Sequence, residues 1–271
     1  MILLVDAGNT RIKWRIVAQR TLLASGSLAT ADCRTGQVAE LESHWAVSGL
    51  KRAVLSCVAD TSVQAGLDAL LVRLGIARHW LKPDRLNFGL NNLYDAPEQL
   101  GADRYAALIA ASRLKLGHCV VICAGTATTV DMLSLNNEFL GGVIIPGPAL
   151  MRASLLQGTR QIENRMQAPA QVAPDFLAWP RDTDQAVRLG IGLAQAGTVR
   201  AMCDRLPRLP GEPVWLVLTG GARAMLRDGL TWQAHDGAQV QLVEIEDLVL
   251  EGLAWVALTL ESTQFEGGNP I

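Results

Sequence analysis

One local pattern occurs twice in this 271-residue chain, at its start and again near its middle. Each copy is a short apolar run, a turn built around a glycine, and a second strand-like run. The first copy occupies residues 2–17 around Gly8, and the second occupies residues 119–133 around Gly125. A chance match of a few residues is the alternative. The shared strand–turn–strand context favours a duplicated architecture with two similar halves.

The remaining periodicity predicts further strands and helices in both halves. Strands are expected at residues 22–28, 53–58, 139–145 and 214–218, and helices at residues 63–74, 102–116, 184–190 and 248–260. This mixture predicts an α/β fold with domains 1–116 and 117–271. The stretch near Gly117 has no disordered composition, so we expect the halves to pack directly and to hold a ligand in the cleft between them.

Composition excludes several classes of protein. With 49% hydrophobic and 18% charged residues, the chain can bury a large core. A net charge of −2 gives no general attraction to nucleic acid. The five cysteines form no CxxC pair, so they predict neither a disulfide framework nor a zinc site, and reduced thiols fit a cytoplasmic protein. The start lacks a signal-peptide pattern and no apolar run reaches about 18 residues, so we expect no membrane association.

The first glycine turn has the residue types that bind a nucleotide's phosphates. Gly8 allows close backbone approach, and the Thr10 hydroxyl can donate to a phosphate oxygen. Asp6 can hold hydrated Mg²⁺, and Lys13 adds a positive charge. An ordinary hairpin turn with Asp6 hydrogen-bonded to it is the alternative for this motif alone.

Two further turns strengthen the case for a nucleotide. Residues 125–129 offer a glycine and three hydroxyls at a strand end, and Gly220 and Gly221 follow the apolar strand at 214–218. The second turn alone is weak evidence, and the third alone fits a tight connection equally well. Together, the three turns favour nucleotide binding.

An acid–base pair opens the helix expected at residues 102–116. Asp103 is a candidate general base for an acceptor hydroxyl, and Arg104 is a candidate clamp for an acidic substrate group or the transferred phosphoryl group. The alternative is a helix-capping acid beside a solvated arginine.

These motifs, in this order, resemble the type III pantothenate kinases over residues 6–221. The matching segments are Asp6-Ala-Gly-Asn-Thr-Arg-Ile-Lys13, Tyr94 with Pro97, Gly101-Ala-Asp-Arg104, Gly125-Thr-Ala-Thr-Thr-Val-Asp131, Gly141-Gly-Val-Ile-Ile-Pro-Gly147 and Thr219-Gly-Gly221. The resemblance implies the actin/hexokinase-like (ASKHA) fold, with two ribonuclease-H-like domains of mixed sheets flanked by helices, and an obligate homodimer. It also implies ATP-dependent phosphorylation of pantothenate to 4′-phosphopantothenate, the first step of coenzyme A biosynthesis.

The resemblance assigns roles by position. ATP contacts fall on Asp6, Ala7, Gly8, Asn9, Thr10, Arg11, Ile12, Lys13 and Thr126, with Mg²⁺ expected at Asp6 through water. Pantothenate contacts fall on Tyr94, Gly101, Ala102, Asp103, Arg104 and Thr183, and Asp103 becomes the proton acceptor. For Thr183, the residues alone favour an N-cap hydroxyl.

One position departs from the family pattern. Members usually have Asp before the second glycine turn, where it binds a monovalent cation such as K⁺ or NH₄⁺, and this chain has Cys123. A thiol is a poor ligand for a hard cation, so K⁺ dependence is doubtful here.

Two other functions remain open. One is a catalytically weak or inactive regulatory accessory protein of the same fold, and the other is a different actin-like phosphotransferase. The pair Asp6 and Asp103 favours catalysis over the first, and the segment from Tyr94 to Arg104 favours pantothenate over other acceptors.

Overall fold

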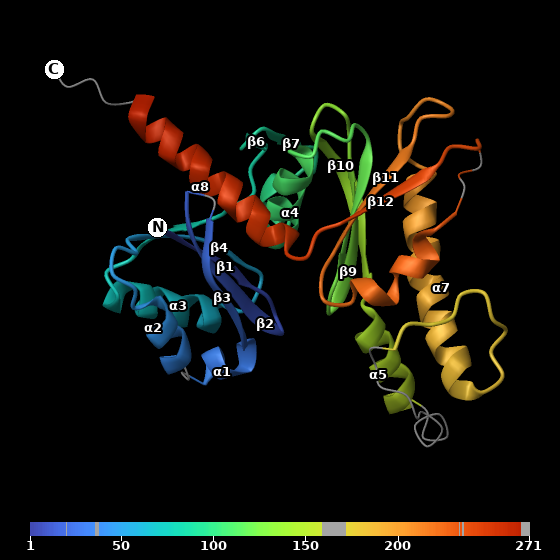
Figure 1. The fold of residues 1–271 in the computed structure, drawn as a ribbon, viewed down its shortest axis with the longest axis horizontal. Helices are drawn as coiled ribbons and strands as arrows, with labels where there is room; N and C mark the ends of the chain where they lie inside the picture. Colours follow the sequence, from blue (N-terminus) through green and yellow to red (C-terminus); the bar gives the residue numbers. More distant parts are fainter. Residues whose placement is uncertain (20, 36–37, 159–171, 233, 235, 267–271) are drawn as a thin grey trace. The chain divides into compact units, whose positions relative to one another are not determined.

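The computed structural model describes residues 1–271 except 20, 36–37, 159–171, 233, 235 and 267–271 (Figure 1). The chain forms two compact units. Unit 1 comprises Met1–Arg113 and Leu248–Ile271, and unit 2 comprises Leu114–Asp247. Among the described residues, no helix combines the length and apolar composition needed to cross a membrane.

Unit 1 is built on a five-stranded sheet with the order β3-β2-β1-β4-β5. Strands β1 (Ile2–Ala7), β2 (Arg11–Ala18) and β3 (Thr21–Ala29) form an antiparallel meander, which confirms the predicted hairpin. Strand β4 (Arg52–Cys57) runs parallel to β1, and β5 (Ala77–Trp80) runs parallel to β4.

Alternation along β1 separates two layers of unit 1. Leu3 and Val5 belong to a core completed by α1 (Thr30–Arg34), α2 (Ala39–Trp45) and α3 (Thr61–Arg73). Because successive side chains point to opposite faces, Leu4 faces the other way, where α8 (Leu248–Glu266) packs. Helix α4 (Ala102–Ser112) packs beside α8, and the segment before it holds β6 (Leu86–Asn87), β7 (Leu90–Asn92) and a 3₁₀ turn, Pro97–Gln99.

Unit 2 repeats this strand topology. Strands β8 (Cys119–Ala124), β9 (Ala127–Leu133) and β10 (Glu138–Pro146) form an antiparallel meander. Strand β11 (Val214–Thr219) runs parallel to β8, and β12 (Val240–Glu244) runs parallel to β11. The order β10-β9-β8-β11-β12 matches that of unit 1 strand for strand, so the repeat seen in the sequence is a repeat of topology.

Helices also accompany the second sheet. Helix α7 (Thr183–Cys203) packs on the sheet through Val199 and Met202, with α5 (Pro148–Gly158) beside it. Two short 3₁₀ turns, Arg223–Met225 and Arg227–Leu230, follow β11. The fold is therefore α/β, with two mixed sheets flanked by helices, as expected.

The last helix does not belong to the half of the chain in which the sequence division, 1–116 and 117–271, would place it. The units part at Arg113, close to that boundary, but α8 belongs with unit 1. A Cβ on Gly252 of α8 would collide with the backbone carbonyl of Ala106 in α4, so only glycine permits this close helix approach. An ion pair between Arg15 and Glu251, 2.6 Å from Nη1 to Oε1, also joins α8 to β2.

Candidate functional site

The first glycine turn is held by short backbone contacts. The Gly8 amide donates to the Arg11 carbonyl at 3.0 Å, and a Cβ on Gly8 would lie 3.2 Å from that same oxygen. Buried Thr30 supports the turn from α1. Its hydroxyl donates to the Gly8 carbonyl at 2.7 Å, and its amide donates to the Thr10 carbonyl at 3.0 Å. Asn9 and Thr10 remain exposed, so this rigid turn presents its groups to solvent.

Asp6 is fixed by a residue that the sequence analysis missed. Ser56 lies directly opposite Asp6 on β4, and its hydroxyl donates to Asp6 Oδ1 at 3.0 Å. Ser56 is fully buried, so it has little freedom to move away. Lys13 lies opposite Asp6 on the other side, on β2. Mg²⁺ prefers one or two carboxylates and keeps several waters, and the anchored Asp6 carboxylate fits that role.

The other residues of the first motif differ in what they can offer. Ala7 and Ile12 are fully buried, so only their backbone groups can contact a ligand. Arg11 donates from Nη2 to the Ser27 hydroxyl at 2.6 Å, which directs its guanidinium toward β3. Asn9 donates from Nδ2 to the Val58 carbonyl at 3.2 Å.

The candidate base, Asp103, lies in the first turn of α4. The N-cap residue is Gly101, so Asp103 does not serve as the helix cap. Its Oδ1 accepts from the Arg104 amide at 2.7 Å, and burial raises the pKa of its carboxyl. A Cβ on Gly101 would lie 2.6 Å from Asp103 Oδ1, so a larger residue there would displace the carboxylate.

Val58 lies next to both the glycine turn at residue 8 and the start of α4. Asn9 donates to its carbonyl, and a Cβ on Gly101 would lie 3.6 Å from its Cγ1. The glycine turn at residue 8 and the start of α4 therefore lie at the same end of unit 1. This places the phosphate-binding candidates near the candidate base.

Tyr94 and Arg104 are brought together as a pair. Arg104 is only 6% exposed, and its Nη1 and Nη2 each donate to the Tyr94 hydroxyl at 3.4 Å. The guanidinium carbon also lies 5.9 Å from the centre of the Tyr94 ring. Ala102 is buried in α4 and can offer only its backbone.

Three glycine motifs meet in unit 2. The Gly147 amide donates to the Thr126 carbonyl at 2.9 Å. A Cβ on Gly147 would collide with the Gly125 carbonyl, and one on Gly220 would collide with the Ala124 carbonyl. Gly220 also has φ +98°, which side chains rarely adopt. The second and third turns of the sequence analysis therefore pack against each other.

Only one of the three hydroxyls expected in the second turn is exposed. Thr126 is exposed, whereas Thr128 and Thr129 are buried. Of this group, Thr126 is the hydroxyl that can meet a phosphate.

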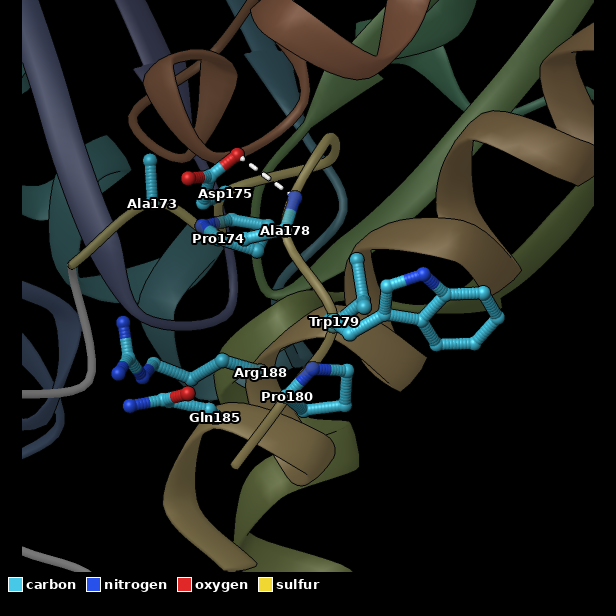
Figure 2. Close-up of a pocket in the computed structure, with 9 residues that line it drawn as sticks. Ala173, Pro174, Asp175, Ala178, Trp179, Pro180, Gln185 and Arg188 are labelled. Carbon is cyan, nitrogen blue, oxygen red and sulfur yellow. Dashed lines mark hydrogen bonds between the residues drawn. The ribbon is translucent and has the colours of Figure 1, made fainter. Parts of the chain in front are cut away.

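Thr183 is the first residue of α7, but it is not the N-cap. Asp182 takes that position, with its carboxylate accepting from the Gln185 amide at 2.7 Å. Beside this helix start is a hollow of about 320 Å³ lined by Ala173, Pro174, Asp175, Ala178, Trp179, Pro180, Gln185, Arg188 and Leu189 (Figure 2). Asp175 shapes its loop by accepting from the Ala178 amide at 3.2 Å. Thr183 does not line this hollow, and its contact with substrate stays a prediction.

Comparisons with known proteins agree on one family. The family model described as type III pantothenate kinase matches residues 2–205. A type III pantothenate kinase of Azoarcus sp. (strain BH72) is 43% identical over 261 residues, covering 95% of this chain and 90% of that protein. Another, of Aromatoleum aromaticum, is 38% identical over 261 residues, covering 95% and 98%.

Solved structures agree on the fold. A candidate Baf family transcriptional activator from Campylobacter jejuni superposes with a TM-score of 0.60 at 19% identity, covering 96% of this chain and 99% of that one. A candidate 2-dehydro-3-deoxygalactonokinase from Sinorhizobium meliloti gives 0.59 at 14% identity, covering 96% and 97%. At such identities the likeness concerns the fold alone, and that fold is the expected actin/hexokinase-like one.

Proposed function

The chain belongs to the type III pantothenate kinase family, and we propose that its glycine turns bind one ATP while Asp103 accepts the proton of the pantothenate hydroxyl. The protein is a pantothenate kinase, a phosphotransferase with an alcohol group as acceptor. The product is 4′-phosphopantothenate, at the first step of coenzyme A biosynthesis. Neither the fold nor the relatives favour an inactive regulatory protein instead.

One observation carries the assignment of residues. In unit 1, the turn at Gly8 and the start of α4 lie on two sides of Val58, so phosphate-binding groups and a carboxylate share one end of the unit. Phosphoryl transfer depends mainly on positioning and electrostatic stabilisation, and this arrangement supplies both.

For ATP, we propose contacts from residues 6–13 and from Thr126. Backbone amides of the two glycine turns and the hydroxyls of Thr10 and Thr126 donate to phosphate oxygens, and Lys13 adds a positive charge. Asp6, held by Ser56, binds Mg²⁺ through water. When bound, Mg²⁺ neutralises charge that develops on the transferred phosphoryl group.

For pantothenate, we propose that Asp103 orients the hydroxyl and takes its proton. Burial keeps this carboxylate in a poorly solvated setting, where its raised pKa makes it a better base than an ordinary aspartate. Arg104 carries the positive charge that recognises the carboxylate of pantothenate, and Tyr94 packs beside it. Gly101, Ala102 and Thr183 complete the proposed contacts.

For the monovalent cation, we propose that this enzyme binds K⁺ or NH₄⁺ weakly. Cys123 is partly buried, with Thr129 and Thr219 opposite it on the neighbouring strands. A thiol is a soft ligand, so the carboxylate oxygen that suits K⁺ is missing at this position.

For assembly and location, we propose a cytoplasmic homodimer. Leu177 and Trp179 are 97% and 88% exposed, and such apolar side chains are typical of subunit interfaces. The five cysteines, all among the described residues, form no disulfide, and a reducing compartment is consistent with that. Light scattering of the purified protein measures the subunit number.

A coupled assay for ADP release tests the function. ADP release that requires pantothenate supports it, and release that is equal with and without pantothenate contradicts it. Panthenol, which lacks the carboxylate, gives a matched control for the role of Arg104 because its hydroxyl acceptor is unchanged.

A further inference from the structure

Asn92 is a fully buried polar residue just before the loop that carries Tyr94. Buried polar groups need hydrogen-bond partners, and Asn92 finds them within this loop. Its Nδ2 donates to the Pro97 carbonyl at 3.0 Å, and its Oδ1 accepts from the Tyr94 amide at 3.1 Å. One side chain therefore ties together two points of the loop.

Arg85, which precedes this loop in the chain, also binds it through hydrogen bonds to two of its backbone carbonyls. Arg85 is exposed as a residue, and its guanidinium donates from Nη1 to the Asn92 carbonyl and from Nη2 to the Asp95 carbonyl, both at 3.0 Å. The Asn92 amide donates back to the Arg85 carbonyl at 2.8 Å. A planar guanidinium suits this double contact better than a lysine, which has a single charged nitrogen.

These contacts matter because the two proposed recognition residues are supported differently. Arg104 belongs to α4, whose position is set by buried packing. Tyr94 lies in the loop, and the distance of 3.4 Å from its hydroxyl to Arg104 depends on the loop's path. A side chain on an unfixed loop would lose entropy each time it bound substrate.

We propose that Asn92 and Arg85 are positioning residues for the pantothenate site, which hold Tyr94 against Arg104 before the substrate arrives. This inference rests on the proposed function, in which Tyr94 and Arg104 bind pantothenate. A merely structural role would weaken binding of both substrates, because unit 1 as a whole would loosen. A positioning role changes pantothenate binding alone, since the turn at Gly8 lies on other strands.

The test measures KM for each substrate in Asn92→Ala, Arg85→Ala and Arg85→Lys. Losing the contacts of Arg85 or Asn92 should raise the pantothenate KM about tenfold, with the ATP KM changed by less than about twofold. Arg85→Lys should recover part of the loss. Arg78→Ala is the matched control, because Arg78 pairs with Asp68 away from this loop.

A second readout follows the loop without using activity. In Asn92→Ala, the Tyr94 amide loses its acceptor, so its hydrogen exchange should accelerate while amides of β1 keep their rates. Unchanged hydrogen exchange at the Tyr94 amide overturns the positioning role proposed for Asn92.

Tyr94→Phe separates the two levels of the proposal. If Tyr94→Phe raises the pantothenate KM but Asn92→Ala and Arg85→Ala do not, the positioning role is wrong and the proposed function stands. Equal rises in both KM values also overturn positioning. If Tyr94→Phe leaves the pantothenate KM unchanged, the proposed role of Tyr94 fails, and the inference fails with it.

Discussion

Replacing Asp103 by Asn tests the proposed base with little disturbance to the fold. In the native protein the Arg104 amide donates to Asp103 Oδ1 at 2.7 Å. The side-chain amide of Asn keeps an oxygen at that place, so it can still accept this hydrogen bond. It cannot take a proton from the pantothenate hydroxyl. General-base catalysis contributes about 10²–10⁴-fold to a rate, so turnover should fall by about that factor, equivalent to about 3–5 kcal/mol in the barrier.

The pH dependence follows from the same carboxyl. Burial raises the pKa of Asp103, so the native enzyme should lose turnover as the pH falls through that raised value. The Asn variant should lack this acidic limb, because it has no proton to gain at residue 103. Steady-state turnover across pH, measured by coupled ADP release, checks both expectations.

Stability should change in the opposite direction from activity. A carboxyl with a raised folded-state pKa favours folding most below its unfolded pKa and loses that contribution as the pH rises through the folded value. At neutral pH, Asp103→Asn removes this cost, so its melting temperature should equal or exceed that of the native protein. Near-normal turnover, or an intact acidic limb, would refute the assignment of Asp103.

Three further changes are expected to have separate effects. Asp6→Asn should raise the Mg²⁺ concentration needed for half-maximal activity. Ser56→Ala should raise that concentration by a smaller factor, about tenfold, because a buried hydrogen bond to the Asp6 carboxylate is lost. An unchanged Mg²⁺ titration in both variants contradicts this expectation. The native enzyme should be as active in K⁺ as in tetramethylammonium, within about twofold, whereas the activity of Cys123→Asp should rise with K⁺ concentration. Strong K⁺ activation of the native enzyme contradicts the role given to the thiol. Gly252→Val should lower the free energy of unfolding by about 1–3 kcal/mol, because the valine side chain would meet the Ala106 backbone. Urea denaturation measures this difference, and equal stability of the two proteins would contradict that packing.

Local patterns predicted the fold well where a short segment determines its own structure. Alternation over residues 11–17 and the turn at Gly8 predicted the β1–β2 hairpin, and the repeat at Gly125 predicted its counterpart in unit 2. Strands β6 and β7, in and beside the polar stretch at 87–101, were not predicted, because strands of two and three residues are too short to show a periodic pattern.

Long-range packing explains what the sequence did not predict. The helix at residues 248–260 was expected, but its place in unit 1 depends on contact with Ala106, far away in the chain. Ser56 escaped notice because a single serine in an apolar strand has no distinguishing pattern, and only the pairing of β4 with β1 puts it beside Asp6. Asn92 was missed for another reason: its partners at Tyr94 and Pro97 are close in sequence, but one asparagine within a polar stretch has no distinguishing pattern.

A crystal structure with a non-hydrolysable ATP analogue, Mg²⁺ and pantothenate tests the central claim most directly. We predict that the phosphates contact both glycine turns, at Gly8 and Thr126, and that the pantothenate hydroxyl lies within hydrogen-bond distance of Asp103. Finding the nucleotide on one turn alone, or pantothenate away from Asp103, would contradict the account.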